Sequence, residues 1–176
     1  MSTNPDSKKN EQKEKKQKPD TFWSEMASLQ KQRKNAEFEE AARSVKKPDN
    51  EKGGDGRTLL MLAAECGWTK AMKILLAKPA AGNINFSVVT GKTALIISAK
   101  WCQPAAVRLL LEKDASINHV CAYGWTALDY AEFRDVGTRF ISAKELKHPK
   151  IAKKIKDNRK VKEILRKNGG KLAAEL

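Results

Sequence analysis

The sequence of 176 residues lacks the marks of membrane-spanning, secreted and disulfide-rich proteins. No apolar run approaches the ~18 residues that cross a bilayer, and residues 1–20 are polar and charged, without the apolar stretch of a secretory signal. The three cysteines, Cys66, Cys102 and Cys121, are odd in number and have no paired spacing. Such cysteines indicate free thiols in a reducing compartment. We therefore expect a cytoplasmic, intracellular protein, with a nuclear or exported location left open.

Residues that could carry catalysis or bind a metal are also sparse. Gly91-Lys92-Thr93 matches the end of a phosphate-binding loop, but Phe86 stands where that motif needs a further glycine. His119-x-Cys121 has no second close pair of ligands, and the other cysteines and His148 lack zinc-like spacing. No serine, histidine and acid form a nucleophile-elbow or comparable arrangement. We expect a protein that is not an enzyme and that uses no metal or other cofactor.

Acidic residues are scarce near the C-terminus, where the positive charge collects. The chain carries a formal net charge of +14, and residues 141–171 hold twelve Lys or Arg against three acids. These lysines could neutralise the phosphates of RNA, with contact limited to the backbone because no aromatic residues interleave to stack on bases. Equally, they could keep an exposed cap soluble. The candidate residues for RNA or another acidic surface are Lys147, Lys150, Lys153, Lys154, Lys156, Arg159 and Lys160, with Lys162 beside them.

What the sequence does have is an internal repeat. A Gly-x-Thr signature followed by a short apolar run occurs at Gly56, Gly91 and Gly124, and the threonines lie 35 and then 33 residues apart. A repeat of that period predicts a stacked array, and such arrays usually bind other macromolecules.

Each repeat contains a short helix, a tight turn, a longer helix and an extended exit. The distance from Thr58 to Leu76 equals that from Thr93 to Leu111, so the two extra residues of the first period lie in the connection at 79–82. The third repeat is interrupted. If Leu165 corresponds to Leu111, about twenty-one extra residues separate its two helices.

These residues resemble the ankyrin repeat. The resemblance rests on the frame G-x-T-x-L-x-x-(A/S)-A, a small turn, a leucine-rich helix and a Val/Ile-Asn exit, and it is good from Gly56 to Asn118. The chain departs from the family pattern with Leu59, Ala94 and Ala127 in place of proline, and with Met61, Ile96 and Asp129 in place of histidine. The resemblance implies an all-α fold, an ankyrin-like α-solenoid of stacked helix pairs joined by short β-hairpin-like finger connections.

The expected organisation has five parts. Thr21 can cap a helix from Phe22, and a second helix fits Ala36–Lys46, so this hairpin resembles a worn capping repeat. Asn158 is expected to cap the last helix, Arg159–Lys167. The parts are a disordered charged tail at 1–19, a degenerate N-terminal helical cap at 20–48, ankyrin-like repeats at 49–133, a basic insertion at 134–157, and a C-terminal capping helix and tail at 158–176.

In the ankyrin family, partners contact the finger tips and the exposed side of the first helices. This chain places apolar residues at those positions, and exposed apolar surface usually marks an interface. The alternative is that the insertion or the N-terminal hairpin covers them. The candidate protein-binding residues are Val88, Val89, Trp101, Val120, Tyr123, Trp125 and Phe133.

The sequence therefore predicts a non-enzymatic module for protein–protein interaction, with a partner that the repeat frame does not identify. An RNA- or ribonucleoprotein-associated accessory protein that uses the basic C-terminal region is the alternative. An exported effector is a weaker one, based on fold analogy alone.

Overall fold

The computed structural model describes residues 22–45, 53, 55–78, 83–138, 142, 145 and 147–176. The predicted tail at 1–19 and the predicted cap residue Thr21 lie outside the described residues. The described chain is helical, with an isolated β-bridge between Ser87 and Thr93 and a further bridge residue at Thr58. The predicted all-α solenoid is confirmed.

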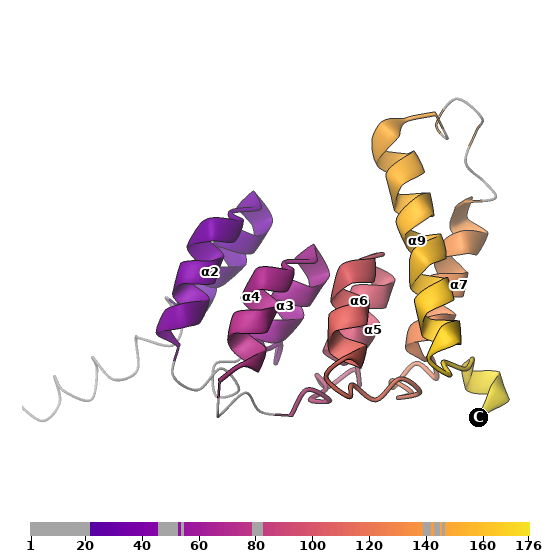
Figure 1. The fold of residues 1–176 in the computed structure, drawn as a ribbon, viewed down its shortest axis with the longest axis horizontal. Helices are drawn as coiled ribbons and strands as arrows, with labels where there is room; N and C mark the ends of the chain where they lie inside the picture. Colours follow the sequence, from indigo (N-terminus) through magenta and orange to yellow (C-terminus); the bar gives the residue numbers. More distant parts are fainter. Residues whose placement is uncertain are drawn as a thin grey trace, which may run out of the picture.

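The helices stack in pairs along one direction (Figure 1). A helix at 22–32 precedes α2 (Asn35–Ser44), and three further pairs follow. They are α3 (Leu59–Cys66) with α4 (Thr69–Leu76), α5 (Ala94–Lys100) with α6 (Pro104–Leu111), and α7 (Ala127–Thr138) with α9 (Pro149–Lys167). A short 3₁₀ turn, η1 (Ala173–Glu175), ends the chain.

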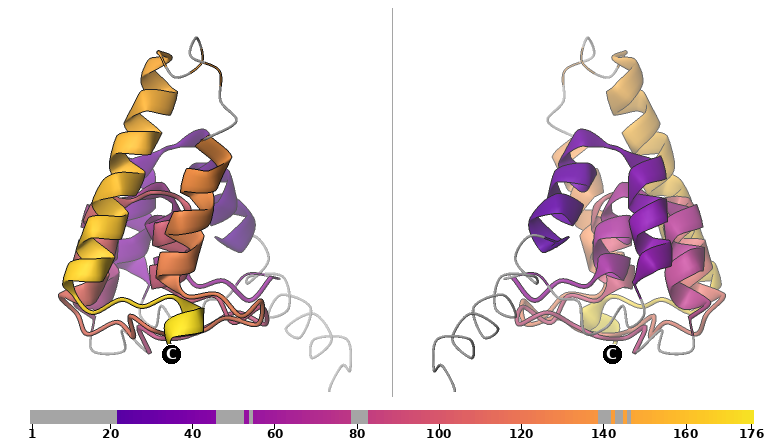
Figure 2. Two further views of the ribbon diagram at one scale, coloured as in Figure 1. Left: turned by 90° about the vertical axis from the view of Figure 1, so that its right-hand side faces the viewer. Right: turned by 90° about the vertical axis from the view of Figure 1, so that its left-hand side faces the viewer.

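The pairs form two parallel rows. The first helices α3, α5 and α7 pack on one another in sequence, and α2, α4, α6 and α9 form the second row. Figure 2 looks along the array and shows α7 and α9 side by side, with the connections gathered along one edge and extending towards the side of α7. One apolar core runs through the stack from Met26 to Leu165.

The repeated threonine starts each first helix in the same way. The hydroxyl of Thr58 accepts a hydrogen bond from the Met61 amide at 3.4 Å, and that of Thr93 accepts one from Ile96 at 3.3 Å. Such caps satisfy an amide that the helix leaves unpaired. Mostly apolar residues follow, and α5 buries every residue from Ala94 to Ala99 because it lies between two neighbouring first helices.

The exit asparagines connect successive repeats. The side-chain oxygen of Asn85 accepts a hydrogen bond from the Ser116 amide at 2.7 Å, and that of Asn118 accepts one from the Lys171 amide at 2.8 Å. The same contact thus joins repeat one to repeat two and repeat two to the C-terminal segment. The chain after α9 therefore continues the repeat pattern past the insertion.

The insertion lengthens both helices of the third pair. α9 is a continuous helix of 19 residues that begins at Pro149, whose fixed φ suits a first helical position. Asn158 therefore lies inside α9, and the prediction that it caps a helix at Arg159 was wrong. Its side chain is buried and donates to the Ala131 carbonyl of α7 at 3.0 Å, so it serves a contact between helices that local sequence does not reveal.

The alignment of the last helix with the second repeat also differs by one residue from the sequence prediction, which paired Leu165 with Leu111. The Leu110 carbonyl accepts from the Ala115 amide at 3.0 Å, and the Leu165 carbonyl accepts from Gly170 at 2.8 Å in the same five-residue closure. Leu165 thus corresponds to Leu110, not to Leu111, because the helix-ending hydrogen bonds align these two. The third repeat is accordingly interrupted by one residue more than the spacing of leucines indicates.

Candidate protein-binding face

Each finger closes with the same pair of backbone hydrogen bonds. In each finger, the backbone amide of one residue donates to the carbonyl of the residue four positions later. The carbonyl of that first residue accepts a hydrogen bond from the amide of the glycine three positions later. The three first residues are Gly53, Val88 and Cys121, and the return bonds from Gly56, Gly91 and Gly124 measure 2.8, 2.7 and 2.9 Å. The returning glycines have φ of +75°, +71° and +74°, a conformation that other residues rarely adopt. The Gly-x-Thr signature is therefore both the turn of a finger and the cap of the next helix.

The second and third fingers are fixed against each other. The Ala122 amide donates to the Thr90 carbonyl at 3.0 Å, and a ring nitrogen of His119 lies 2.8 Å from the Gly91 carbonyl oxygen. A β-carbon on Gly91 would meet the Ala122 nitrogen at 2.7 Å, which shows how closely the two backbones approach. Side chains on these tips therefore project from a firm support.

The finger tips carry exposed apolar side chains at the positions that the sequence indicated. Val89 is 98% exposed, Tyr123 is 60% exposed and Val120 is 42% exposed. Val88 is half-buried and packs against the core at the base of its tip. The sequence analysis left open that the insertion or the N-terminal hairpin covers the tips. In the described structure, the side chains of Val89, Val120 and Tyr123 are not covered.

Aromatic side chains extend this surface onto α7 and the end of α5. Phe133 is 61% exposed and Trp101 is 36% exposed. Trp125 is half-buried, with its ring centroid 4.9 Å from that of Tyr130 and 5.0 Å from that of Phe133. Trp125 thus supports Phe133, whereas the sequence had placed it among the contact residues themselves. We call Val88, Val89, Trp101, Val120, Tyr123, Trp125 and Phe133 together the apolar face.

Two positions in each repeat face each other across this surface, directly before the threonine and seven residues after it. In the first repeat they hold Arg57 and Glu65, which form an ion pair at 2.9 Å. In the second they hold Lys92 and Lys100, and in the third the stacked pair Trp125 and Phe133. One backbone arrangement therefore presents charge at one end of the array and aromatic rings at the other.

Lys92 belongs to the aromatic end. Its ammonium group lies 4.7 Å from the ring centroid of Tyr123 and 5.9 Å from that of Tyr130. A cation over an aromatic face at these distances is stabilised by the ring quadrupole. Lys92 thereby helps to orient the exposed Tyr123 ring.

A groove connects the second finger with the helix ends. It has a volume of about 330 Å³ and lies between the first two fingers and the ends of α3 and α5. Its lining includes Arg57, Val88, Val89, Lys100 and Trp101. The tip residues Val88 and Val89 therefore share a concave surface with Trp101.

Two ionisable groups near this surface, Asp55 and Tyr130, have pKa values that are shifted for different reasons. Partial burial opposes ionisation of Asp55, but hydrogen bonds from the backbone and guanidinium of Arg57 outweigh it and lower the pKa of the carboxyl. Burial raises the pKa of the Tyr130 hydroxyl, and the Cys121 thiol 3.7 Å away adds to the shift. Asp55 is thus negatively charged beside Arg57. Tyr130 is uncharged, and its ring packs against Trp125.

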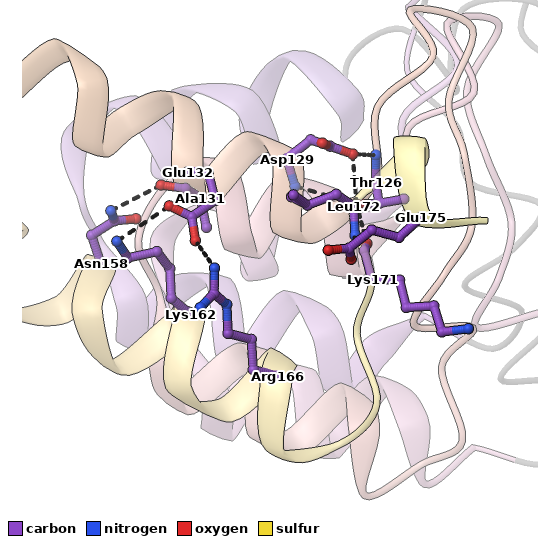
Figure 3. A network of polar contacts seen from close by, with 10 residues as sticks. All are labelled: Thr126, Asp129, Ala131, Glu132, Asn158, Lys162, Arg166, Lys171, Leu172 and Glu175. Atoms are coloured by element: carbon purple, nitrogen blue, oxygen red, sulfur yellow. Dashed lines mark hydrogen bonds and ion pairs between the residues drawn. The ribbon is translucent and has the colours of Figure 1, made fainter.

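The lysines proposed for an acidic partner lie on a different part of the molecule. Lys147 and the candidates on α9 are exposed, and the N-terminal end of α9 points away from the fingers (Figure 1). Lys162 differs from them because it is half-buried and lies 3.4 Å from a carboxylate oxygen of Glu132, which Arg166 also contacts at 2.6 Å (Figure 3). Lys162 therefore helps to hold α9 on α7.

Sequence reasoning missed the residues that anchor the last repeat. The carboxylate of Asp129 accepts hydrogen bonds from the Thr126 amide and hydroxyl, both at 2.8 Å (Figure 3). It also accepts one from the Ala173 amide at 2.9 Å. The sequence offered one sign of this role, because Asp129 stands where the ankyrin pattern has a histidine. No spacing rule links it to Ala173, since the intervening insertion removes the repeat period.

Within the described ranges, no group of three or more His, Cys, Asp or Glu residues is placed to hold a metal ion. None of the helices that the structure describes is both long and apolar enough to cross a bilayer.

Comparison with known families agrees with the repeat seen in the structure. A family model described as ankyrin repeats in three copies matches residues 34–121 and 82–157. A comparison with curated proteins gave no significant match. Since the two matches together span most of the stack of helix pairs, the chain belongs to the ankyrin-repeat family.

Proposed function

We propose that this protein is a non-enzymatic interaction module that binds another protein through the apolar face. Ankyrin repeats in general support a role in protein–protein interaction, and the family is typically non-enzymatic. One observation carries the assignment to this surface. Among the described residues, six large apolar side chains are exposed, and five of them belong to the apolar face: Val89, Trp101, Val120, Tyr123 and Phe133.

The chemistry of the face suits an interface. Aromatic residues on a firm support bury a large area at low entropic cost, and hot spots are enriched in tryptophan and tyrosine. Truncation of a hot-spot residue costs about 2 kcal/mol or more, which weakens binding roughly thirtyfold. Tyr123 and Phe133 are the best candidates because each is more than half exposed and each contacts a neighbour that fixes its ring.

The test compares variants that leave the fold intact. Val89→Ser with Tyr123→Ser removes two exposed tip side chains, whereas changing Trp125 would also disturb its packing on Tyr130. A control with Lys70→Ser and Lys73→Ser alters two exposed residues of α4, in the other row of helices.

Affinity purification from cells with quantitative mass spectrometry reports the partners of each variant. We expect a set of proteins that wild type and control recover equally and that the tip variant loses at least tenfold. The interaction should persist at raised salt because the contact is apolar. Equal recovery of every partner by a folded tip variant would remove the apolar face from consideration.

A further inference from the structure

The basic residues of α9 lie on a part of the helix that the array does not cover. Lys150, Lys154, Asn158, Val161 and Leu165 follow one another at helical spacing and share one side of α9. The last three are buried, whereas the two lysines are exposed. The N-terminal end of α9 extends beyond its neighbouring helices (Figure 1), and at that end the stripe that packs into the array changes to lysine.

The charge of this segment is almost entirely positive. We define the basic face as Lys147, Lys150, Lys153, Lys154, Lys156, Arg159 and Lys160. Only one acid, Asp157, lies between Lys147 and Lys160. Glu132, the acid that α7 offers to α9, is used by Lys162 and Arg166, and no ion pair involves the basic face among the described residues. A surface that serves solubility alone usually mixes both signs, as α2 does with Lys34 against Glu37 and Arg43 against Glu40.

The basic face also surrounds much of the helix. At about 100° per residue, the six basic residues from Lys150 to Lys160 spread over roughly 220° of its circumference. The remaining arc holds Ile151, Ile155 and Asn158, of which the isoleucines are half-buried. A flexible strand can follow such a curved surface, whereas a straight duplex reaches one side of it. Membrane binding by a surface helix needs an exposed apolar face, which this arrangement does not provide.

We propose that the basic face binds the phosphate backbone of single-stranded RNA. Six of its seven members are lysines, which act as point charges and lack the planar fork that recognises a base or phosphate in two bonds. No exposed aromatic residue lies among them to stack on a base. Binding is therefore independent of base sequence, and it leaves the exposed finger-tip residues of the apolar face, Val89, Val120 and Tyr123, free for a protein.

The geometry sets the expected salt dependence. Lys150 to Lys160 span about 15 Å of helix, and we take about four phosphates as neutralised over this length. For a single strand, the slope of log K against log salt is about −0.7 per phosphate, which gives about −2.8. Between about 50 and 200 mM salt the affinity should fall roughly fiftyfold.

Fluorescence anisotropy of a short labelled oligouridine, measured across that salt range, tests the proposal on the full-length chain. The basic-face variant carries Lys150→Gln, Lys153→Gln and Lys154→Gln, and the control carries Lys70→Gln, Lys73→Gln and Lys113→Gln at exposed positions elsewhere. Both lose the same charge. We expect the control to bind within about twofold of wild type, and the basic-face variant to bind at least tenfold more weakly with a shallower slope.

Other probes distinguish single-stranded RNA from the other ligands that a basic surface could bind. Oligothymidine of equal length should bind comparably, because lysines contact the phosphates that both strands share. Tighter binding of duplex RNA, of vesicles with anionic headgroups or of a polyglutamate peptide would overturn the proposal. So would equal weakening in both variants, a flat salt response, or binding to the DNA strand alone. The Val89→Ser, Tyr123→Ser variant should keep full RNA binding, so this proposal and the protein-binding function fail independently.

Discussion

Asn158 offers a direct test of how α9 is held, through the substitution Asn158→Asp. At the start of a helix, asparagine and aspartate cap almost equally well, so a capping residue would tolerate this change. In the structure Asn158 is 3% exposed, and its amide nitrogen donates to the Ala131 carbonyl at 3.0 Å. An aspartate there has no hydrogen to donate when ionised, and it would place a carboxylate oxygen against a carbonyl oxygen.

The magnitude follows from the proton that the buried aspartate must take up. Keeping a carboxyl with an ordinary pKa near 3.9 protonated at pH 7 costs about 4 kcal/mol, and at pH 5 about 1.5 kcal/mol. The protonated form can donate to Ala131 again. The folded-state pKa of Asp at this position would be raised, so its stabilising contribution is complete below about pH 4 and is lost as the pH rises. We therefore expect a large penalty at neutral pH that shrinks in mild acid.

Urea unfolding followed by circular dichroism at pH 5 and pH 7 measures this penalty against wild type at each pH. Asn83→Asp is the matched control because Asn83 is exposed and its side-chain oxygen already serves as an acceptor, for the Asn85 amide. It changes the net charge equally and should alter the stability by less than about 0.5 kcal/mol. A penalty for Asn158→Asp below about 1 kcal/mol that does not change with pH would refute the buried position of this side chain.

Three further predictions test the fingers, the C-terminal anchor and the core. In urea unfolding, Gly91→Ala should destabilise the protein by at least 1 kcal/mol more than Gly124→Ala. Both glycines have positive φ, but a β-carbon on Gly91 would also meet the backbone of the next finger. Equal effects of the two substitutions would contradict this close approach. Asp129→Ala should cost about 2–3 kcal/mol and speed hydrogen exchange in the C-terminal segment, because it removes a helix cap and the anchor of that segment; unchanged exchange would argue against the anchor. With Tyr123→Phe, Tyr130 is the one tyrosine left, and its ultraviolet titration in the folded protein should occur at higher pH than in urea, since burial raises its pKa. Stability from Tyr130 is then complete below about pH 10 and is lost as the pH rises further, and coincident titrations would refute its burial.

The sequence predicts the parts of the fold that depend on neighbouring residues. The short helices begin at Thr58 and Thr93, where the Gly-x-Thr frame placed them, and the glycines before them form the entry turns, because helix start and turn need only residues within one short segment. The repeat frame also placed Val89 and Tyr123 on connections, but the sequence left open whether another segment covers them. Their exposure is a finding of the structure.

Contacts across the insertion could not be predicted in this way. Asn158 has the residue type and spacing of a cap, yet its partner is the carbonyl of Ala131, 27 residues earlier. Glu132 likewise pairs with Arg166 across 34 residues. Nothing local distinguishes such residues from exposed polar ones. The half-buried state of Trp125 is also a matter of packing, because it depends on which aromatic rings the third repeat brings beside it.

The repeat frame explains how one scaffold can present different chemistry along its length. The position before each threonine and the position seven residues after it are fixed by the finger turn and by two turns of the first helix. They hold an ion pair in the first repeat and stacked rings in the third. Arg57 already pairs with Glu65 and Asp55, so a partner there would have to replace existing contacts. Phe133 instead exposes 61% of its surface, and burying it requires no bond to be broken. Selection of a partner is therefore expected to depend mainly on the third repeat and its finger, with the first repeat acting as support.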